Sequence, residues 1–259
     1  MNLKKRFKLL LLNKIYSQPS KEDLLTLIGQ LHPVGTNRNL IRIGGESDGG
    51  YLVPDDLNGL EACFSPGVGG KSKFERECAD MGMEIFMADA SVDGPAFEDP
   101  RFNFQKKFIG GRQKGNFMTL ETWINGSEVR EEADLLLQMD IEGFEYEVLN
   151  ATSIQTLKRF RIIIIEFHLL DNLEMPWYYQ RSKRAFEKLL VNHTCVHIHP
   201  NNSCGITKIK GVEVPGIAEF TFLRKDRIKE KRKIESLPHP LDRDSVAAES
   251  IDLPKIWYT

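Results

Sequence analysis

Two runs of almost uninterrupted apolar residues constrain the fold of this chain more than any other feature. Residues 135–139 are LLLQM, and residues 162–165 are four consecutive isoleucines. A strand with one wet face alternates apolar and polar side chains, whereas a strand covered on both faces needs apolar side chains throughout. We therefore expect the central strands of a parallel sheet that has helices on both faces.

Shorter segments before these runs alternate between strand-like and helix-like patterns. Residues 62–65, 84–88 and 102–109 are strand-like, and a helix is predicted from 72 to about 81. This alternation is typical of βαβ units. Further upstream, residues 40–53 contain two extended runs joined by a glycine-rich turn, which predicts a hairpin.

The last two predicted strands, residues 194–199 and 218–223, are joined differently. The segment between them is rich in Asn, Gly and Pro and shows no helical pattern. Because a parallel crossover normally needs a helix, we expect this pair to be antiparallel. The sequence thus predicts an α/β fold whose mostly parallel sheet ends in one reversed strand.

With 259 residues, the chain is long enough for one sizeable domain with extensions. Residues 1–35 are expected to form a helical extension, with a capping signal at Ser20 before helix-spaced leucines. Residues 36–225 are expected to form the main domain. Residues 226–259 are expected to form a charged helix, covering the run 225–233, and a surface tail.

Composition limits the partners. A net charge of −2 gives no overall electrostatic footprint for nucleic acid, although the first eight residues are locally basic. The apolar run 9–12 is too short for a transmembrane segment. The four cysteines lack C-x-x-C spacing, which favours buried reduced thiols and a cytoplasmic location. Nothing in the sequence indicates the oligomeric state.

A glycine loop follows the predicted strand at residues 62–65 and predicts a nucleotide site. It contains Gly67 and Gly69, where backbone without Cβ can approach a ligand, and a helix with free N–H groups follows. Asp89 ends the next apolar run, where its carboxylate can accept hydrogen bonds from a ribose diol. The third glycine of a dinucleotide fingerprint is replaced by Ser72, which weakens the prediction of a nicotinamide enzyme.

Polar side chains follow both long apolar runs. Asp140 and Glu142 come directly after the first, and His168 comes just past the second. Since parallel strands end at one edge of the sheet, we expect these three groups to share a crevice and to act on a substrate hydroxyl. Glu145 and Glu147 are expected to form a solvated first helical turn. Four further polar residues are expected either to orient substrate or metal or to form a polar turn: His197, His199, Asn201 and Asn202.

Several motifs together resemble one family. The segment MDIEGFEYEVL at residues 139–149 is similar to the signature of FkbM-type S-adenosylmethionine-dependent methyltransferases. Other similar pieces are Asp48-Gly49-Gly50-Tyr51, the Ser65-to-Gly69 loop, Thr119-Leu120-Glu121, Glu166-Phe167-His168, His199-Pro200-Asn201-Asn202 and Glu219-Phe220-Thr221-Phe222. The resemblance covers roughly residues 40–225.

The resemblance implies a Rossmann-like class I fold, with a mostly parallel seven-stranded sheet and an antiparallel final strand. It also implies S-adenosylmethionine as methyl donor and a hydroxyl acceptor on a sugar or other small molecule. Apart from the resemblance, Asp140 and Glu142 at the sheet edge could hold a substrate, the amino group of the cofactor or a divalent cation such as Mg²⁺, and no dedicated metal ligands are expected. The cofactor would be held by Ser65, Pro66, Gly67, Val68, Gly69, Asp89, Ala90 and Gly110, and the reacting hydroxyl by Asp140, His168 and Glu142.

One departure from the family stands at Ser65, where many methyltransferases carry an acid. It leaves open which group binds the amino-acid end of the cofactor and whether activity is retained. Two alternatives therefore stay beside methyl transfer. One is a nicotinamide-dependent oxidoreductase, and the other is a catalytically silent protein that keeps the cofactor site.

Overall fold

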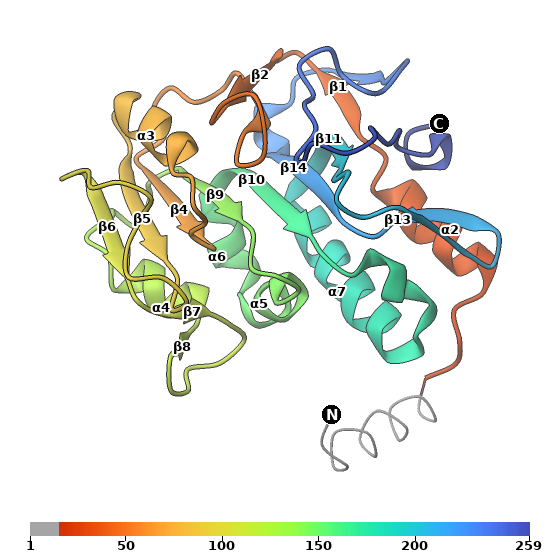
Figure 1. Ribbon diagram of the computed structural model, residues 1–259, viewed down its shortest axis with the longest axis horizontal. Helices are drawn as coiled ribbons and strands as arrows, with labels where there is room; N and C mark the ends of the chain where they lie inside the picture. Colours follow the sequence, from red (N-terminus) through yellow and green to blue (C-terminus); the bar gives the residue numbers. More distant parts are fainter. Residues whose placement is uncertain (1–15) are drawn as a thin grey trace.

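The two long apolar runs lie in the middle of a seven-stranded sheet (Figure 1). In this computed structural model, which describes residues 16–259, the strand order is β11-β14-β10-β9-β4-β5-β6. The strands are β4 (Ala62–Pro66), β5 (Glu84–Ala88), β6 (Phe102–Gln105), β9 (Leu135–Met139), β10 (Phe160–Phe167), β11 (His193–Pro200) and β14 (Ala218–Arg224). The predicted central strands, β9 and β10, pair in parallel.

The uninterrupted apolar sequence of these strands reflects two separate cores. Leu135 and Leu137 belong to the hydrophobic cluster on one face of the sheet, whereas Leu136 belongs to the cluster on the other face. Ile163 and Ile162 divide in the same way. Since successive side chains of a strand point to opposite faces, a sheet with two cores leaves no position for water-facing polar residues.

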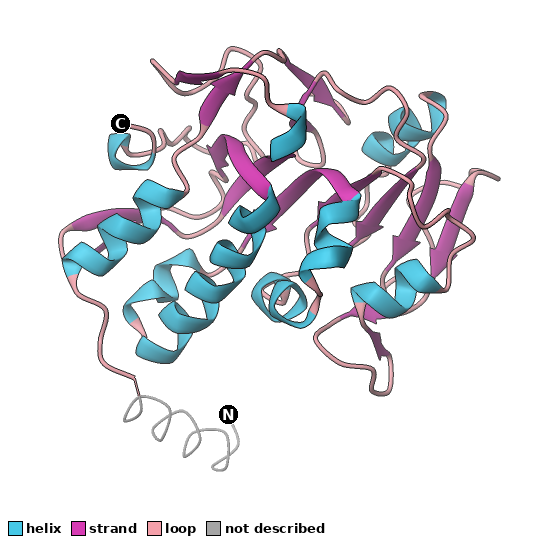
Figure 2. Cartoon of the chain, turned by 180° about the vertical axis from the view of Figure 1, so that it is seen from behind, coloured by secondary structure: helices cyan, strands magenta, loops and turns pink. Residues whose placement is uncertain are grey.

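The two faces carry different covers (Figure 2). On one face lie helices α2 (Lys21–Gln30), α4 (Leu120–Asn125), α5 (Glu145–Ala151), α6 (Ile154–Arg159) and α7 (Pro176–Asn192). The other is covered by α3 (Lys73–Asp80) and the antiparallel hairpin of β2 (Leu40–Ile43) and β3 (Tyr51–Pro54). The predictions of helices on both faces and of the hairpin are confirmed.

The final strand of the sheet in chain order, β14, is reversed. It pairs antiparallel with β10 on one side and β11 on the other, while β10, β9, β4, β5 and β6 all pair in parallel. A hairpin of β12 (Ile206–Ile209) and β13 (Val212–Pro215) connects β11 to β14 in place of a helix. The predicted sheet, mostly parallel with one antiparallel strand, is confirmed.

The predicted helix over residues 225–233 is wrong. These residues form a 3-10 turn, η2 (Lys225–Arg227), and strand β15 (Lys231–Lys233). The strand pairs antiparallel with β1 (Val34–Thr36), so its backbone hydrogen-bonding groups are satisfied by a segment almost 200 positions away in the chain. This tertiary pairing outweighs the local helical preference of a charged run.

The ends of the described chain pack close together. Helix α2 begins at Ser20 with a capping box, as predicted, and the rest of the expected helical extension, residues 1–15, lies outside the described residues. The tail ends in η3 (Lys255–Trp257), and Trp257 is buried in the core on the α2 side. The remaining elements are β7 (Phe108–Ile109), β8 (Phe117–Met118) and η1 (Leu170–Glu174). Within residues 16–259, no helix has the length and apolar character needed to cross a membrane.

Candidate functional site

The carboxyl ends of β4 and β9 meet at one glycine. Gly67 follows β4 with φ +93°, and a Cβ built there would lie 1.5 Å from the carbonyl oxygen of Asp140, which follows β9. The backbone N–H of Asp140 donates to the carbonyl of Pro66 at 3.2 Å. Only glycine fits this position, because any side chain would overlap the neighbouring backbone and strain φ. The sheet edge thus has a fixed junction from which cavities open.

The first cavity, which we call the apolar cavity, has a volume of about 240 Å³. Its flat walls come from aromatic and aliphatic side chains, and Asp89 lies at its edge. The Asp89 carboxylate accepts hydrogen bonds from the backbone N–H groups of Val68 at 3.1 Å and Ser91 at 2.6 Å. Its full lining is Gly67, Ala88, Asp89, Ser91, Phe108, Ile109, Phe117, Asp140, Ile141, Glu142 and Phe144.

The second cavity, which we call the polar cavity, has a volume of about 180 Å³ and shares Gly67 and Asp140 with the first. Glycine backbone and charged or polar side chains surround it. Its lining is Asp48, Gly49, Tyr51, Gly67, Gly69, Gly70, Lys71, Glu75, Gln138 and Asp140. A ligand with a flat apolar end and a charged end can therefore lie across the Gly67–Asp140 junction.

Next to this junction, His168 is surrounded by carboxylates. Its Nδ1 lies 3.1 Å from Oε1 of Glu145. On the other side of the ring, Nε2 lies 3.4 Å from Glu142, 3.6 Å from Glu166 and 3.7 Å from Asp140. With Nδ1–H donating to Glu145, a neutral ring would turn a lone pair toward three carboxylates. A proton or another cation at Nε2 removes that repulsion.

The pKa values of this cluster follow from burial and charge. Burial alone would lower the pKa of His168, but the hydrogen bond to Glu145 and the charges of Glu145 and Asp140 raise it to about 9. Burial, followed by the charge of Glu166, raises the pKa of Asp140 to about 8. Burial also raises the pKa of Glu166. Such perturbed groups in a cleft are a frequent mark of functional sites.

The same cluster has the donors of a divalent cation site. One ligand atom each from Asp140, Glu166 and His168 lie within 4.8 Å of one another. Three buried carboxylate oxygens lack a hydrogen-bond partner among the described residues: Oδ1 of Asp140, Oε2 of Glu145 and Oε2 of Glu166. Because buried unpaired oxygens are costly, the cluster fits a bound cation.

Sequence reasoning placed Asp140, Glu142 and His168 in one crevice, and the structure brings them together. The expectation for Glu145 is wrong, because its side chain is fully buried rather than solvated. Glu142 and Gly143 both have positive φ, 56° and 96°, so the chain turns sharply after Asp140 and Glu145 points back toward His168. Local periodicity cannot show such a reversal.

Glu166 was missed as a site residue, although a signal existed. It is the one acid in the otherwise apolar end of β10, and a buried carboxylate in such a run needs a partner. Asn201 provides one, since its side-chain amide donates to Glu166 Oε1 at 3.0 Å. The other three residues of the polar turn hold the C-terminal tail: His197 contacts Asp242, His199 contacts the carbonyl of Arg243, and Asn202 donates to the carbonyl of Val246.

The residues predicted for the cofactor divide into two groups. Gly67, Gly69 and Asp89 line the cavities. Ser65, Pro66, Val68, Ala90 and Gly110 do not line either cavity. The Ser65 hydroxyl is buried between Glu75 and Gln138, and a Cβ at Gly110 would come within 2.7 Å of the Phe117 ring. These residues support the lining rather than form it.

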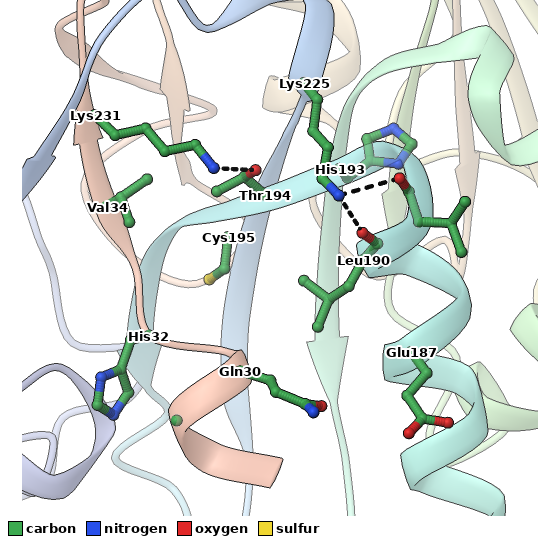
Figure 3. Close-up of a pocket in the computed structure, with 12 residues that line it drawn as sticks. Gln30, His32, Val34, Glu187, Leu190, His193, Thr194, Cys195, Lys225 and Lys231 are labelled. Carbon is green, nitrogen blue, oxygen red and sulfur yellow. Dashed lines mark hydrogen bonds between the residues drawn. The ribbon is translucent and has the colours of Figure 1, made fainter. Parts of the chain in front are cut away.

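A separate open cavity of about 560 Å³ lies at the start of β11, near the end of α7 (Figure 3). The ammonium of Lys225 is taken up by the carbonyls of Leu190 and Val191, and that of Lys231 by the Thr194 hydroxyl. The ammonium of Lys225 thus lies at the C-terminus of helix α7, where a positive charge interacts favourably with the last carbonyls of the helix. Ligands of open α/β sheets bind at the carboxyl ends of strands, so this cavity is not the candidate site.

One family model matches the part of the chain that contains the His168 cluster. The family model of the methyltransferase FkbM domain matches residues 108–189, a segment that includes Asp140, Glu145, Glu166 and His168. No curated protein matches the sequence of the chain.

Two solved structures show distant likenesses. One is magnesium protoporphyrin IX methyltransferase from Synechocystis PCC 6803 with bound SAH, at 12% identity and TM-score 0.35, covering 66% of this chain and 76% of that one. The other concerns conversion of a disulfide bond into a thioacetal group during echinomycin biosynthesis, at 14% identity and TM-score 0.30, covering 64% and 76%. Residues 108–189 are thus similar to the methyltransferase FkbM domain, and the strand order of the sheet is that of a Rossmann-like α/β fold.

Proposed function

We propose that this protein transfers a methyl group from S-adenosylmethionine to a hydroxyl oxygen of a small molecule, such as a sugar. The observation that carries the proposal is the junction at Gly67 and Asp140, where two cavities meet beside the His168 cluster. The adenosine fits the aromatic walls of the apolar cavity, with Asp89 within reach of the ribose. The amino-acid end fits the polar cavity, so the sulfonium lies near Asp140.

A hydroxyl acceptor must lose a proton as its oxygen attacks. When bound, the cofactor supplies an electrophilic methyl carbon: the oxygen forms the new bond, the carbon–sulfur bond breaks, and sulfur keeps the electron pair. The proton goes to the ionised fraction of Asp140, whose carboxylate lies 3.7 Å from Nε2 of His168. With its pKa raised to about 8, the Asp140 carboxylate is a stronger base than an ordinary aspartate. Glu145 orients the ring of His168, and Glu142 lies at the solvent side.

A divalent cation is part of this proposal. Asp140, Glu166 and His168 would hold Mg²⁺ or Mn²⁺, and the imidazole donor suits the latter better. When bound, the ion would supply positive charge that lowers the pKa of a coordinated hydroxyl. The buried carboxylate oxygens without partners support this assignment.

The acceptor and location are proposed on fewer observations. The four cysteines are free thiols, three of them buried, which supports a reducing, cytoplasmic environment. An acceptor other than nucleic acid is supported by the net charge of −2. A glycan or another hydroxylated metabolite remains the acceptor class that we propose.

The test combines a substrate screen with a matched pair of variants. Purified protein is incubated with labelled S-adenosylmethionine and a panel of sugars and other hydroxylated small molecules, and methylated products are identified by mass spectrometry. His168→Ala should lower the rate about 10²- to 10⁴-fold while SAH affinity stays unchanged. His199→Ala, which touches the tail instead, is the control. Methylation only at nitrogen or carbon would contradict the proposal, and SAH binding without turnover would favour the silent protein.

The cation is tested in the same assay. Removal of divalent ions with a chelator should abolish turnover, and added Mg²⁺ or Mn²⁺ should restore it. SAH binding should not change, since the apolar cavity holds no part of the His168 ring. Full turnover after chelation would show that the cluster works by proton transfer alone.

A further inference from the structure

The carboxyl group of Glu75 is buried, and within residues 16–259 no cationic side chain pairs with it. This residue lies in the first turn of α3 and is 7% exposed. None of the ion pairs found within residues 16–259 includes Glu75, and the one side chain in this range that donates to its carboxyl group is the uncharged hydroxyl of Ser65, at 2.6 Å. Burial raises the pKa of this group, as expected for a carboxylate that lacks a positive partner.

The surroundings hold this carboxylate in one place. Ser65 lies between Glu75 and Gln138, with its Oγ 2.7 Å from the Gln138 side-chain oxygen, and Gln138 donates to the Tyr51 hydroxyl at 2.9 Å. All four side chains are buried. A network of this kind fixes the direction of the acid but adds no charge. Glu75 therefore presents an oriented carboxyl group at the wall of the polar cavity, and a cation bound beside it would favour the ionised form.

The same cavity also has one cationic side chain, Lys71, beside two further acids, Asp48 and Asp140, and Lys71 lies 3.8 Å from the Asp48 carboxylate. The ammonium of Lys71 lies at its exposed side, 3.2 Å from the Ser47 hydroxyl and 3.2 Å from the Asp48 carbonyl. Gly69 and Gly70 leave open space where a Cβ would stand. One wall thus offers a buried carboxyl group, and another offers a cation and accessible backbone. A zwitterion, with an ammonium and a carboxylate on one carbon, matches both walls.

We infer that Glu75 binds the ammonium group of the amino-acid end of S-adenosylmethionine, and that Ser65 positions the Glu75 carboxylate for this contact. The inference rests on the proposed function, because it assigns a role at the same cofactor site. It also explains how a chain with serine at position 65 can recognise a cationic amine: the charge comes from α3, ten residues further along.

The experiment compares two ligands and three proteins by titration calorimetry. The ligands are SAH and a deaminated analogue in which hydrogen replaces the ammonium group. Wild type should bind SAH about 10- to 100-fold more tightly than the analogue, the range expected for one charged contact in a buried site. Glu75→Gln should remove that preference by weakening SAH alone. Glu77→Gln, two residues along the same helix and bonded to Gly44 N–H, should keep it.

The results distinguish failure of the inference about Glu75 from failure of the proposed cofactor site. Equal affinity of the wild-type protein for the two ligands would overturn the inference, and this measurement does not depend on whether Glu75→Gln folds. A folded Glu75→Gln variant that keeps the wild-type preference would also overturn it, as would equal weakening of both ligands. Absence of binding of either ligand to wild type would instead reject the proposed cofactor site itself, and the inference with it.

Discussion

The two halves of the candidate site are built in different ways. The cofactor half, at the ends of β4 and β5, depends on backbone: the left-handed Gly67, and N–H groups that bind Asp89. The acceptor half, at the ends of β9 and β10, depends on side chains gathered around His168. A backbone requirement appears in the sequence as glycine, whereas a side-chain cluster appears only when the chain has folded.

The halves also differ in electrostatic balance. Asp89 accepts hydrogen bonds from two backbone N–H groups and from the Ser91 hydroxyl. In the acceptor half, Asp140, Glu145 and Glu166 each leave one buried oxygen without a partner among the described residues. The first arrangement stabilises the fold, and the second costs stability in order to hold reactive groups.

The largest effect should come from Gly67→Ala. The new methyl group would overlap the Asp140 carbonyl and force a residue with φ +93° into strain, lowering the free energy of unfolding by about 3 kcal/mol. Gly69→Ala is the control, because no atom lies within 4 Å of its Cβ position. Urea denaturation of both variants measures the difference. Similar stability of the two variants would show that the junction at Gly67 does not require glycine.

Asp89→Ala tests the cofactor half by binding rather than by folding. Loss of the carboxylate that we propose binds the ribose should weaken SAH by about 1 to 3 kcal/mol, measured by calorimetry. Asp93→Ala is the control, since Asp93 pairs on the surface with Lys106. An unchanged SAH affinity in Asp89→Ala would place the ribose elsewhere.

The stability of the protein should also depend on pH through a group outside both halves of the site, His193. Burial lowers its pKa from 6.5 to about 4, and its ring bonds the Phe160 carbonyl at the opposite edge of the sheet. Between pH 6.5 and 4 the unfolded chain therefore binds a proton that the folded chain does not. Stability is complete above pH 6.5 and falls by about 2 kcal/mol at pH 5.

Urea denaturation at pH 7 and pH 5 measures this loss. The same comparison with His193→Gln should show a smaller difference between the two pH values, because this titrating group is absent. If the variant loses as much stability as wild type between these pH values, another group is responsible.

The smallest expected effect is a change in the free energy of unfolding that has opposite signs for two Asp→Asn variants, one in each half. Asp140→Asn removes an acid whose pKa burial raises to about 8 in the crowded acceptor half. Because an amide needs no such protonation on folding, the variant should raise the free energy of unfolding by about 1 kcal/mol while it lowers turnover. Asp89→Asn should lower the free energy of unfolding, because the amide replaces an oxygen that accepts hydrogen bonds. Thermal melts of the two variants without ligand show the signs. Destabilisation of both variants would mean that the acids of the two halves are equally well compensated by their hydrogen bonds.

Much of the fold could be predicted because its signals are local or periodic. The runs at 135–139 and 162–165 required burial on both faces, and a segment without a helical pattern required a reversed strand. The charged run 225–233 failed as a helix because its partner, β1, lies at the other end of the described chain. Strand pairing over such a distance leaves no periodic signal within a single window.

By itself, the sequence determined the doubly covered sheet, the glycine at the junction, and the arrival of Asp140 and His168 at one edge. These follow from strand periodicity, from the conformational freedom of glycine and from the common direction of parallel strands. Only the tertiary structure decided that Glu145 turns inward, that Glu166 completes the cluster, and that Glu75 reaches the polar cavity. The reason is physical: side chains from separate elements meet only after packing sets their directions, and burial then gives their charges new pKa values.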